Sequence, residues 1–279
     1  MPELPEVETI VRGLRRRIIG RTISSCRVIE TRILRKTGIH NLEKLTGCKV
    51  TAVERRGKLI LVHLSGGLSL VFHLKMTGQM LLALPQEPRD KHTHFLINFR
   101  MMDAELRFRD VRKFGFICCL ETSKIFTEEP LKNLGPEPLD LEYGAFSELF
   151  VGRKGRLKSL LLNQAFLAGI GNIYADEILF QAGLNPLSPG SSLSEKEIFR
   201  LWQAMRTVLH EAIKKKGSSL RDYRDAEGRK GNFQHLHKVY GRESLPCPGC
   251  GTHIQRIRIG GRSSFFCPQC QRRISRSSS

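Results

Sequence analysis

The first residues of the chain carry groups that can act as a nucleophile and as an acid. The sequence begins Met-Pro-Glu-Leu-Pro-Glu-Val-Glu, so removal of Met1 would leave Pro2 with a free secondary amine. Such an amine can attack an electrophilic carbon and form an iminium ion. Glu3 stands beside it as an acid or base. Proline and glutamate are also common near termini, and short motifs arise without function. The rest of the sequence must show whether this pair is functional.

Four cysteines near the other end have the spacing of a zinc site. Cys247 and Cys250 form one Cys-x2-Cys pair, and Cys267 and Cys270 form a second pair after sixteen residues. Four thiolates suit tetrahedral zinc and leave no open coordination position, so such an ion would be structural. A redox pair or a disulfide framework is the alternative, and two matched pairs in a reduced compartment argue against both.

The charge of the chain predicts a polyanionic partner. Its formal net charge is +19, and residues 151–279 alone hold 22 Lys and Arg against 9 Asp and Glu. Nucleic acid is the first candidate and a membrane surface the second. Early glutamates interrupt any secretory signal, and the uncharged runs are too short to span a membrane. We therefore expect a cytoplasmic protein with reduced cysteines.

The N-terminal half must position Pro2 and Glu3. A length of 279 residues predicts about two domains. Apolar residues at helical spacing from Val7 to Ile18 predict a helix with the reactive pair at its start. The helix dipole there favours an uncharged amine and an ionised carboxylate. Segment 23–120 then shows short strand patterns with a hairpin signal at residues 66–67, which predicts a β-sandwich or barrel.

The pattern of the C-terminal half predicts helices followed by a finger. The pattern predicts helices starting at residue 157, over 172–182 and over 198–212, with the apolar stripe of the last one in the core. Residues 217–241 are polar, basic and rich in glycine, and loops of this length are usually functional or disordered. Segments 255–259 and 263–266 are expected to pair as a hairpin with Arg262 near its turn.

Five separated motifs, in order along nearly the whole chain, resemble the bacterial formamidopyrimidine-DNA glycosylase family. Relatives of the endonuclease VIII type share this architecture, but Leu4 and the third motif are closer to the formamidopyrimidine branch. The motifs are Pro-Glu-Leu-Pro-Glu-Val-Glu at 2–8, Arg-Gly-Lys at 56–58, Asp-Val-Arg-Lys-Phe-Gly at 110–115, Gly-Ile-Gly-Asn-Ile-Tyr-Ala-Asp-Glu at 169–177 and the four-cysteine finger.

The resemblance implies a multidomain α+β fold. Residues 1–130 would form a catalytic β-sandwich that carries the N-terminal helix. Residues 131–240 would form a helix–two-turn–helix DNA-binding domain with a lesion-recognition loop at about 217–240. Residues 241–273 would form the β-hairpin zinc finger, and residues 274–279 a disordered tail.

The resemblance also implies a bifunctional repair enzyme. It would remove oxidised purines, such as 8-oxoguanine and formamidopyrimidines, from duplex DNA and then cleave the strand by β,δ-elimination. Pro2 would attack C1′, Glu3 would protonate the sugar ring oxygen, Lys58 would assist β-elimination, and Arg262 would contact phosphates and act in δ-elimination. We expect one structural zinc ion, damaged double-stranded DNA as partner, and a monomer at the bacterial nucleoid.

Further positions match DNA contacts of the family. Met76, Arg112 and Phe114 would fill the space that a flipped base leaves in the stack. The backbone contacts would come from His92, Arg153, Lys158 and Asn172. Each position also has a plainer interpretation. Met76 and Phe114 could be core residues, Arg112 and Lys58 solvated charges, and Arg262 a general DNA-facing arginine.

Two functions of other classes also fit part of the sequence. A non-catalytic zinc-ribbon protein would bind nucleic acid on the same scaffold, and a ribosome-associated protein would explain the charge. Neither needs a proline amine at the N-terminus, so Pro2, Glu3 and Lys58 favour the enzyme. Within the enzyme class, the alternative is an endonuclease-VIII-like preference for oxidised pyrimidines.

Overall fold

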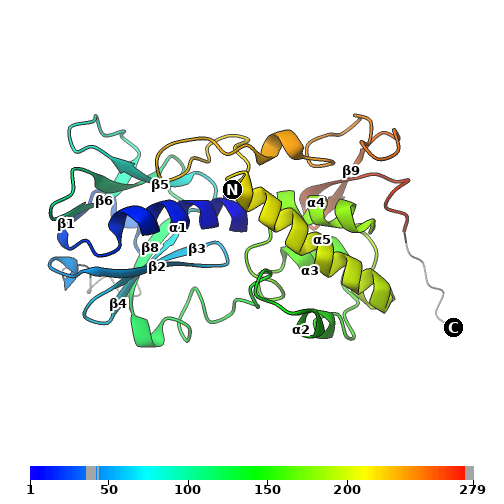
Figure 1. The fold of residues 1–279 in the computed structure, drawn as a ribbon, viewed down its shortest axis with the longest axis horizontal. Helices are drawn as coiled ribbons and strands as arrows, with labels where there is room; N and C mark the ends of the chain where they lie inside the picture. The colour runs from blue at the N-terminus through cyan, green and yellow to red at the C-terminus, as the bar shows by residue number, and fades with distance from the viewer. Residues whose placement is uncertain (36–41, 43, 274–279) are drawn as a thin grey trace. The chain divides into compact units, whose positions relative to one another are not determined.

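The chain divides into two units in the computed structural model, which describes residues 1–35, 42 and 44–273 (Figure 1). The sandwich unit comprises Met1–Lys132 and Lys215–Gln234, and the helical unit comprises Asn133–Lys214 and His235–Ser279. The tail expected at 274–279 lies outside the described residues. None of the described helices is long and apolar enough to cross a bilayer.

The described residues of the sandwich unit form one long helix and two four-stranded antiparallel sheets. Side chains of α1 and of both sheets form one buried cluster, which confirms the predicted β-sandwich. The helix is α1 (Leu4–Ile18), with 3-10 turns η1 (Thr31–Ile33) and η3 (Thr122–Lys124). One sheet has the order β1 (Ile23–Val28), β6 (Thr93–Phe99), β7 (Glu105–Asp110), β5 (Gly78–Ala83), and the other β2 (Val50–Arg56), β3 (Leu59–Leu64), β4 (Leu68–His73), β8 (Phe116–Glu121).

Helix α1 forms as the apolar spacing predicts, and begins three residues earlier than the pattern alone showed. Its apolar residues from Val7 to Ile18 are fully buried. Pro5 lies in the first turn, where its missing N–H costs no hydrogen bond. The helix ends before Gly20, whose φ of +82° suits glycine.

A long loop from the far part of the sequence belongs to the sandwich unit. Residues 215–234 follow the helical segment but group with the sheets. Tyr223 and Ala226 of this loop are part of the sandwich core, and Leu82 N donates to Ala226 O at 2.8 Å. Apolar packing and a backbone hydrogen bond therefore both hold the loop against the sandwich.

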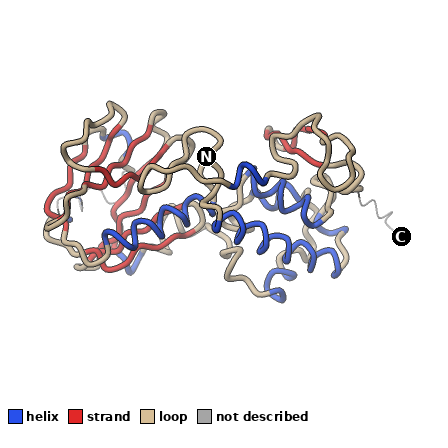
Figure 2. The backbone as a smooth tube through the Cα atoms, turned by 45° about the horizontal axis from the view of Figure 1, so that its top comes forward, coloured by secondary structure: helices blue, strands red, loops and turns tan. Residues whose placement is uncertain are grey.

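In the helical unit, the helix over 172–182 packs against the helix over 195–214, and the finger hairpin follows them in the chain (Figure 2). Gly183, with φ of +68°, ends the helix over 172–182 in the left-handed cap that glycine favours. The sequence pattern did not predict α2, which is six residues long and buries only Phe146. The elements are α2 (Tyr143–Glu148), α3 (Leu157–Leu162), α4 (Asn172–Ala182), η4 (Gly190–Ser192), α5 (Glu195–Lys214), η5 (Phe233–Leu236), β9 (Gln255–Ile259) and β10 (Arg262–Phe266).

Candidate functional site

The start of α1 is held by one carboxylate. Pro2 is buried, and Glu3 is only 3% exposed. Glu6 Oε2 accepts a hydrogen bond from Glu3 N at 2.8 Å, and Glu6 Oε1 accepts one from Ser218 N at 2.7 Å. Glu6 thus joins the N-terminus to the loop that returns from residue 215. No role for Glu6 is predicted from the sequence, although a glutamate three residues after a helix cap is a recognised signal.

Glycines let this loop approach Glu6. Gly217 has a φ of +77°, and a Cβ there would lie 2.6 Å from Glu6 Oε1. A Cβ on Gly231 would lie 2.2 Å from Gly217 O. The hydroxyl of Tyr223 donates to Glu6 O at 3.4 Å, and burial raises the pKa of this phenol, so it stays a donor. A side chain at position 217 would therefore displace Glu6, and one at position 231 would displace the loop backbone.

Lys58 follows a tight turn between β2 and β3. Gly57 adopts a φ of +57° in this turn, and Lys58 is only 8% exposed. Arg55 donates to Gly57 O at 3.2 Å and pairs with Glu8 of α1 at 3.1 Å. Burial alone would raise the pKa of Glu8, but Arg12 and Arg55 hold it below its usual value. A charged network thus ties the Lys58 turn to α1.

His73 is a neutral neighbour of Lys58 and was not among the residues predicted from the sequence. Burial lowers the pKa of His73 to about 3, and the positive charges of Lys75 and Lys58 act in the same direction. His73 Nδ1 accepts a hydrogen bond from Lys75 N at 2.9 Å. The imidazole is therefore uncharged at neutral pH. A single histidine at the end of a strand gave no signal in the sequence.

The structure brings Met76, Arg112 and Phe114 together at the surface. Met76 is 44% exposed and Phe114 is 53% exposed, so the interpretation of both as core residues is wrong. The guanidinium of Arg112 lies 4.5 Å from the Phe114 ring centroid, and Arg112 Nη1 lies 3.1 Å from Met76 Sδ. Exposed apolar side chains next to an arginine fork form a surface suited to stacking against bases.

Asp110 holds the turn that carries two of these three residues. It is fully buried and accepts hydrogen bonds from the Thr77 hydroxyl, from Arg112 N at 3.2 Å and from Gly115 N at 2.7 Å. A Cβ on Gly115 would lie 2.7 Å from Phe108 Cζ, so glycine is required there. These contacts explain why this sequence motif contains both Asp and Gly.

His94 in β6 and His92 just before this strand differ in their surroundings. His94 is 2% exposed, and its Nε2 lies 2.8 Å from Asp110 O. His92, the expected DNA contact, is half-buried, and its backbone N donates to Asp90 Oδ1 at 2.8 Å.

In the helical unit, Asn172 joins a helix start to the finger. Asn172 is the first residue of α4, and its Nδ2 donates to Ser263 O at 2.9 Å. Arg262 precedes Ser263 at the start of β10 and is exposed. Arg153 is also exposed, 6.0 Å from the Phe166 ring centroid. The N-terminus of a helix is a place that attracts phosphate.

Lys158 does not reach the surface, which corrects its assignment as a DNA-backbone contact. It is fully buried, and its Nζ lies 2.7 Å from Asp176 Oδ1 and 2.8 Å from Asn172 O. Asp176 also accepts hydrogen bonds from Ser264 Oγ at 2.6 Å and Phe265 N at 3.0 Å. The pair therefore connects α3, α4 and the finger strand. The sequence shows a lysine but not which side of α3 it occupies.

The four finger cysteines converge as their spacing predicted. All four sulfur atoms lie within 4.8 Å of one another, with Cys247 and Cys270 at 3.8 Å and Cys250 and Cys267 at 3.5 Å. Tetrahedral zinc with bonds of about 2.3 Å needs sulfur atoms about 3.8 Å apart. The cysteines thus form a single structural zinc site.

Glu177 supports the chain that enters the finger. Its carboxylate accepts hydrogen bonds from the backbone N–H groups of Lys238 at 2.9 Å, Val239 at 3.0 Å and Tyr240 at 2.8 Å. Burial raises the pKa of Glu177, and the three N–H groups oppose that effect. Val239 packs with Cys247 and Cys267 in a small core beside the zinc site.

Comparison with known proteins decides which family this arrangement represents. Models of the formamidopyrimidine-DNA glycosylase N-terminal domain, its H2TH domain and a zinc finger found in FPG and IleRS match residues 1–117, 134–224 and 244–273. A formamidopyrimidine-DNA glycosylase of Desulforamulus reducens is 43% identical over 94% of this chain and 95% of its own length. The chain belongs to the formamidopyrimidine-DNA glycosylase family. It is a DNA glycosylase of DNA repair.

Solved structures of relatives agree with this membership. The complex between the Lactococcus lactis Fpg and an abasic site containing DNA matches with a TM-score of 0.90 at 36% identity, over 97% of this chain and all of that one. A structure of MutM in complex with carbocyclic 8-oxo-G containing DNA matches with a TM-score of 0.89 at 36% identity, over 98% and 100%. The predicted family and fold class are thus confirmed.

Proposed function

We propose that this glycosylase removes oxidised purines from duplex DNA through the amine of Pro2 and then cleaves the strand by β,δ-elimination. The observation that carries the proposal is the buried start of α1, where Glu6 holds the backbone of Glu3. A reactive terminus must be held in place to attack one carbon atom, and chain termini are usually loose. The names of the curated relatives and the lesion in the MutM complex support the choice of substrate.

In the first step, the Pro2 nitrogen attacks C1′ and the bond from C1′ to the damaged base breaks. An unperturbed α-amino group has a pKa of about 7.7–8.0, so part of the amine is a free base at neutral pH. The carboxylate of Glu3 takes the proton that Pro2 loses on attack and passes it to the sugar ring oxygen. The released base takes a proton from water, and the ring opens to an iminium ion. A secondary amine leaves no N–H on this iminium, so it cannot lose its charge by deprotonation at nitrogen.

The iminium then acts as an electron sink for strand cleavage. A proton leaves C2′, the 3′ phosphate is expelled, and a second elimination expels the 5′ phosphate. We assign Lys58 to the first elimination and Arg262 to phosphate contact and the second. The zinc site would serve by holding the hairpin that carries Arg262.

The remaining residues would hold the DNA open. Met76, Arg112 and Phe114 would fill the stack, with the Arg112 fork suited to the orphaned cytosine or to a phosphate. His92, Arg153 and Asn172 would contact the backbone. Lys158 is left out because its amino group is engaged inside the helical unit. We infer that the enzyme acts as a monomer on bacterial DNA.

The test is a cleavage assay on two duplexes, one with 8-oxoguanine opposite cytosine and one with thymine glycol opposite adenine. We expect faster cleavage of the 8-oxoguanine strand and phosphate at both ends of the gap. A Glu3→Gln variant should bind the lesion but lose base excision. Faster cleavage at thymine glycol would favour the endonuclease-VIII-like preference, and tight binding without cleavage would reduce the chain to a DNA-binding protein.

A further inference from the structure

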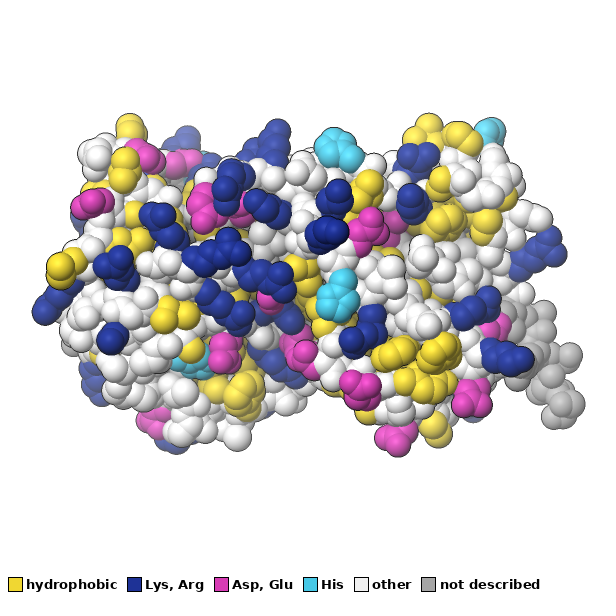
Figure 3. All heavy atoms as spheres, viewed as in Figure 1, with side chains coloured by type: hydrophobic (Ala, Val, Ile, Leu, Met, Phe, Trp, Pro, Cys, Tyr) yellow, Lys and Arg dark blue, Asp and Glu magenta, His cyan; other side chains and the backbone are white. Residues whose placement is uncertain are grey.

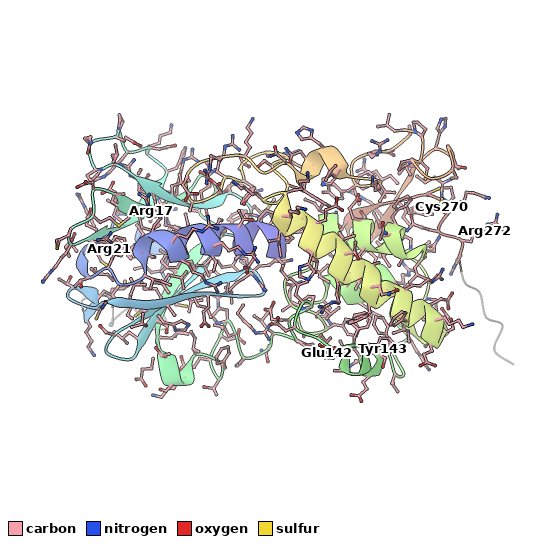
Figure 4. The ribbon with its side chains drawn as sticks, viewed as in Figure 1. Arg17, Arg21, Glu142, Tyr143, Cys270 and Arg272 are labelled. Atoms are coloured by element: carbon pink, nitrogen blue, oxygen red, sulfur yellow. The ribbon has the colours of Figure 1, made fainter. Side chains whose placement is uncertain are left out.

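A second basic site lies in the sandwich unit, at the end of α1 that is remote from Pro2. A cavity of about 420 Å³ opens there, beside the last turn of the helix and the connection between β6 and β7. Fifteen residues at 1.5 Å each separate the two ends of α1 by about 22 Å. Figure 4 labels Arg17 and Arg21 at this end. A molecule in this cavity would not touch Pro2.

The cavity carries positive charge that the protein does not neutralise. Arg16, Arg17 and Arg21 line it and are exposed, and Asp103 is the acidic residue in its lining. Within the described chain, no carboxylate lies at ion-pair distance from any of these three arginines. Other arginines of the same unit do have such partners: Arg12, Arg55, Arg107 and Arg109 each pair with Glu or Asp.

Apolar side chains stand beside these charges. Met101 is 94% exposed and Leu84 is 41% exposed, and both line the cavity. Met101 also has a φ of +52°, which is costly for a residue other than glycine. Arg21 Nη1 donates to Met101 O at 3.0 Å and so holds the turn that presents the side chain to water. Flexible, polarisable methionine suits a surface that adapts to a partner.

We propose that this cavity binds an acidic peptide segment of a partner protein that also bears an apolar side chain. Carboxylates would pair with the guanidinium groups, which form strong bidentate hydrogen bonds. The apolar side chain would cover Met101 and Leu84. DNA phosphates would satisfy the arginines but leave both apolar residues in water, so a peptide fits better. Figure 3 shows many basic side chains on the sandwich unit. Those that line this cavity adjoin exposed apolar residues.

The test is fluorescence anisotropy with the full-length, zinc-loaded protein and a dye-labelled peptide, Asp-Glu-Asp-Asp-Gly-Leu-Phe. We expect a Kd on the order of tens of micromolar. Arg16→Glu with Arg17→Glu should weaken binding at least about tenfold, and Met101→Ser about threefold. Arg27→Glu, which makes half the charge change of the double variant at an exposed site on β1, should leave binding within about twofold. Excision at 8-oxoguanine should be unchanged in the double variant.

Three results would overturn the proposal. The first is equal binding by the wild type and the double arginine variant, with circular dichroism showing that both are folded. The second is equal affinity for a peptide in which Leu and Phe are replaced by Ala, since the apolar contact would then contribute nothing. The third is displacement of the peptide by an undamaged duplex that binds wild type and Met101→Ser alike, which would identify a phosphate site.

Discussion

Glu6 makes the contacts on which the proposed chemistry depends most. Its two oxygen atoms accept hydrogen bonds from Glu3 N and Ser218 N, and its side chain is 1% exposed. This buried acceptor fixes the N–H groups of Glu3 and of Ser218, which lies 212 residues after Glu6, and so links the N-terminus to the loop. A loss of this contact would free Pro2 to move, and a misplacement of about 1 Å is costly in catalysis.

We predict that Glu6→Gln slows base excision at least about tenfold, because the amide NH₂ would face a backbone N–H and leave it unpaired at a cost of about 1–3 kcal/mol. Single-turnover excision of 8-oxoguanine measures this effect. Glu148→Gln, on the exposed face of α2, is the matched control and should keep the full rate. A Glu6→Gln enzyme with wild-type rates would show that the carboxylate does not position the terminus.

His73 predicts a loss of stability in acid. In the unfolded chain its pKa is about 6.5, and burial lowers it to about 3 in the folded protein. Between these values the unfolded state binds a proton that the folded state does not, so this contribution to stability falls as the pH falls from about 6.5 toward 3. Above pH 6.5 both states are neutral, and the contribution is constant.

We predict that His73→Gln, which keeps an acceptor for Lys75 N, loses less thermal stability than the wild type between pH 7.5 and pH 5. The measurement is the thermal unfolding midpoint of both proteins at each pH. An equal loss in both proteins would mean that His73 does not titrate as its burial requires.

At the scale of elements, the loop from residue 215 to 234 offers a matched pair of glycines. Gly217 and Gly228 have φ values of +77° and +78°. A Cβ on Gly217 would strike Glu6 Oε1 at 2.6 Å, whereas a Cβ on Gly228 would meet nothing within 4 Å. Both substitutions to alanine carry the same backbone strain, and only one disturbs the Glu6 contact.

We predict that Gly217→Ala reduces the excision rate at least about tenfold more than Gly228→Ala, while both lower stability by about 1 kcal/mol through backbone strain. Excision rates and denaturant midpoints of the two variants separate these effects. Equal activity losses would indicate that loop strain alone matters and that the fit against Glu6 does not.

The sequence was most informative where structure is local. The α1 stripe, the hairpin at residues 66–67, the helix over 172–182 and the finger cysteines all appear where their spacing predicted. The sequence was least informative about side chains that contact residues far away in the chain. Glu177 binds backbone groups more than 60 residues away, and Lys158 meets Asp176 on another helix. Such partners depend on tertiary packing, so residue type and spacing cannot reveal them.

For the whole molecule, the charge of +19 predicts that DNA binding depends steeply on salt. Each neutralised phosphate contributes a slope of about −0.9 to the plot of log affinity against log salt. We predict a slope of about −3 or steeper for a lesion duplex, and Arg153→Ala should make it shallower by about one for lesion and undamaged DNA alike. Fluorescence anisotropy over a salt series measures this. Affinity that stays flat with salt would contradict the phosphate contacts assigned here.

The central claim is that the free amine of Pro2 forms the bond to DNA, and borohydride trapping on a duplex with 8-oxoguanine opposite cytosine tests it most directly. One preparation carries an N-terminal tag that blocks the amine, and the other is the same protein after cleavage to a terminal Pro2. We predict a covalent complex with the cleaved protein alone, and peptide mapping that places the adduct on Pro2. Equal trapping by the tagged protein, or an adduct on Lys58, would contradict the account.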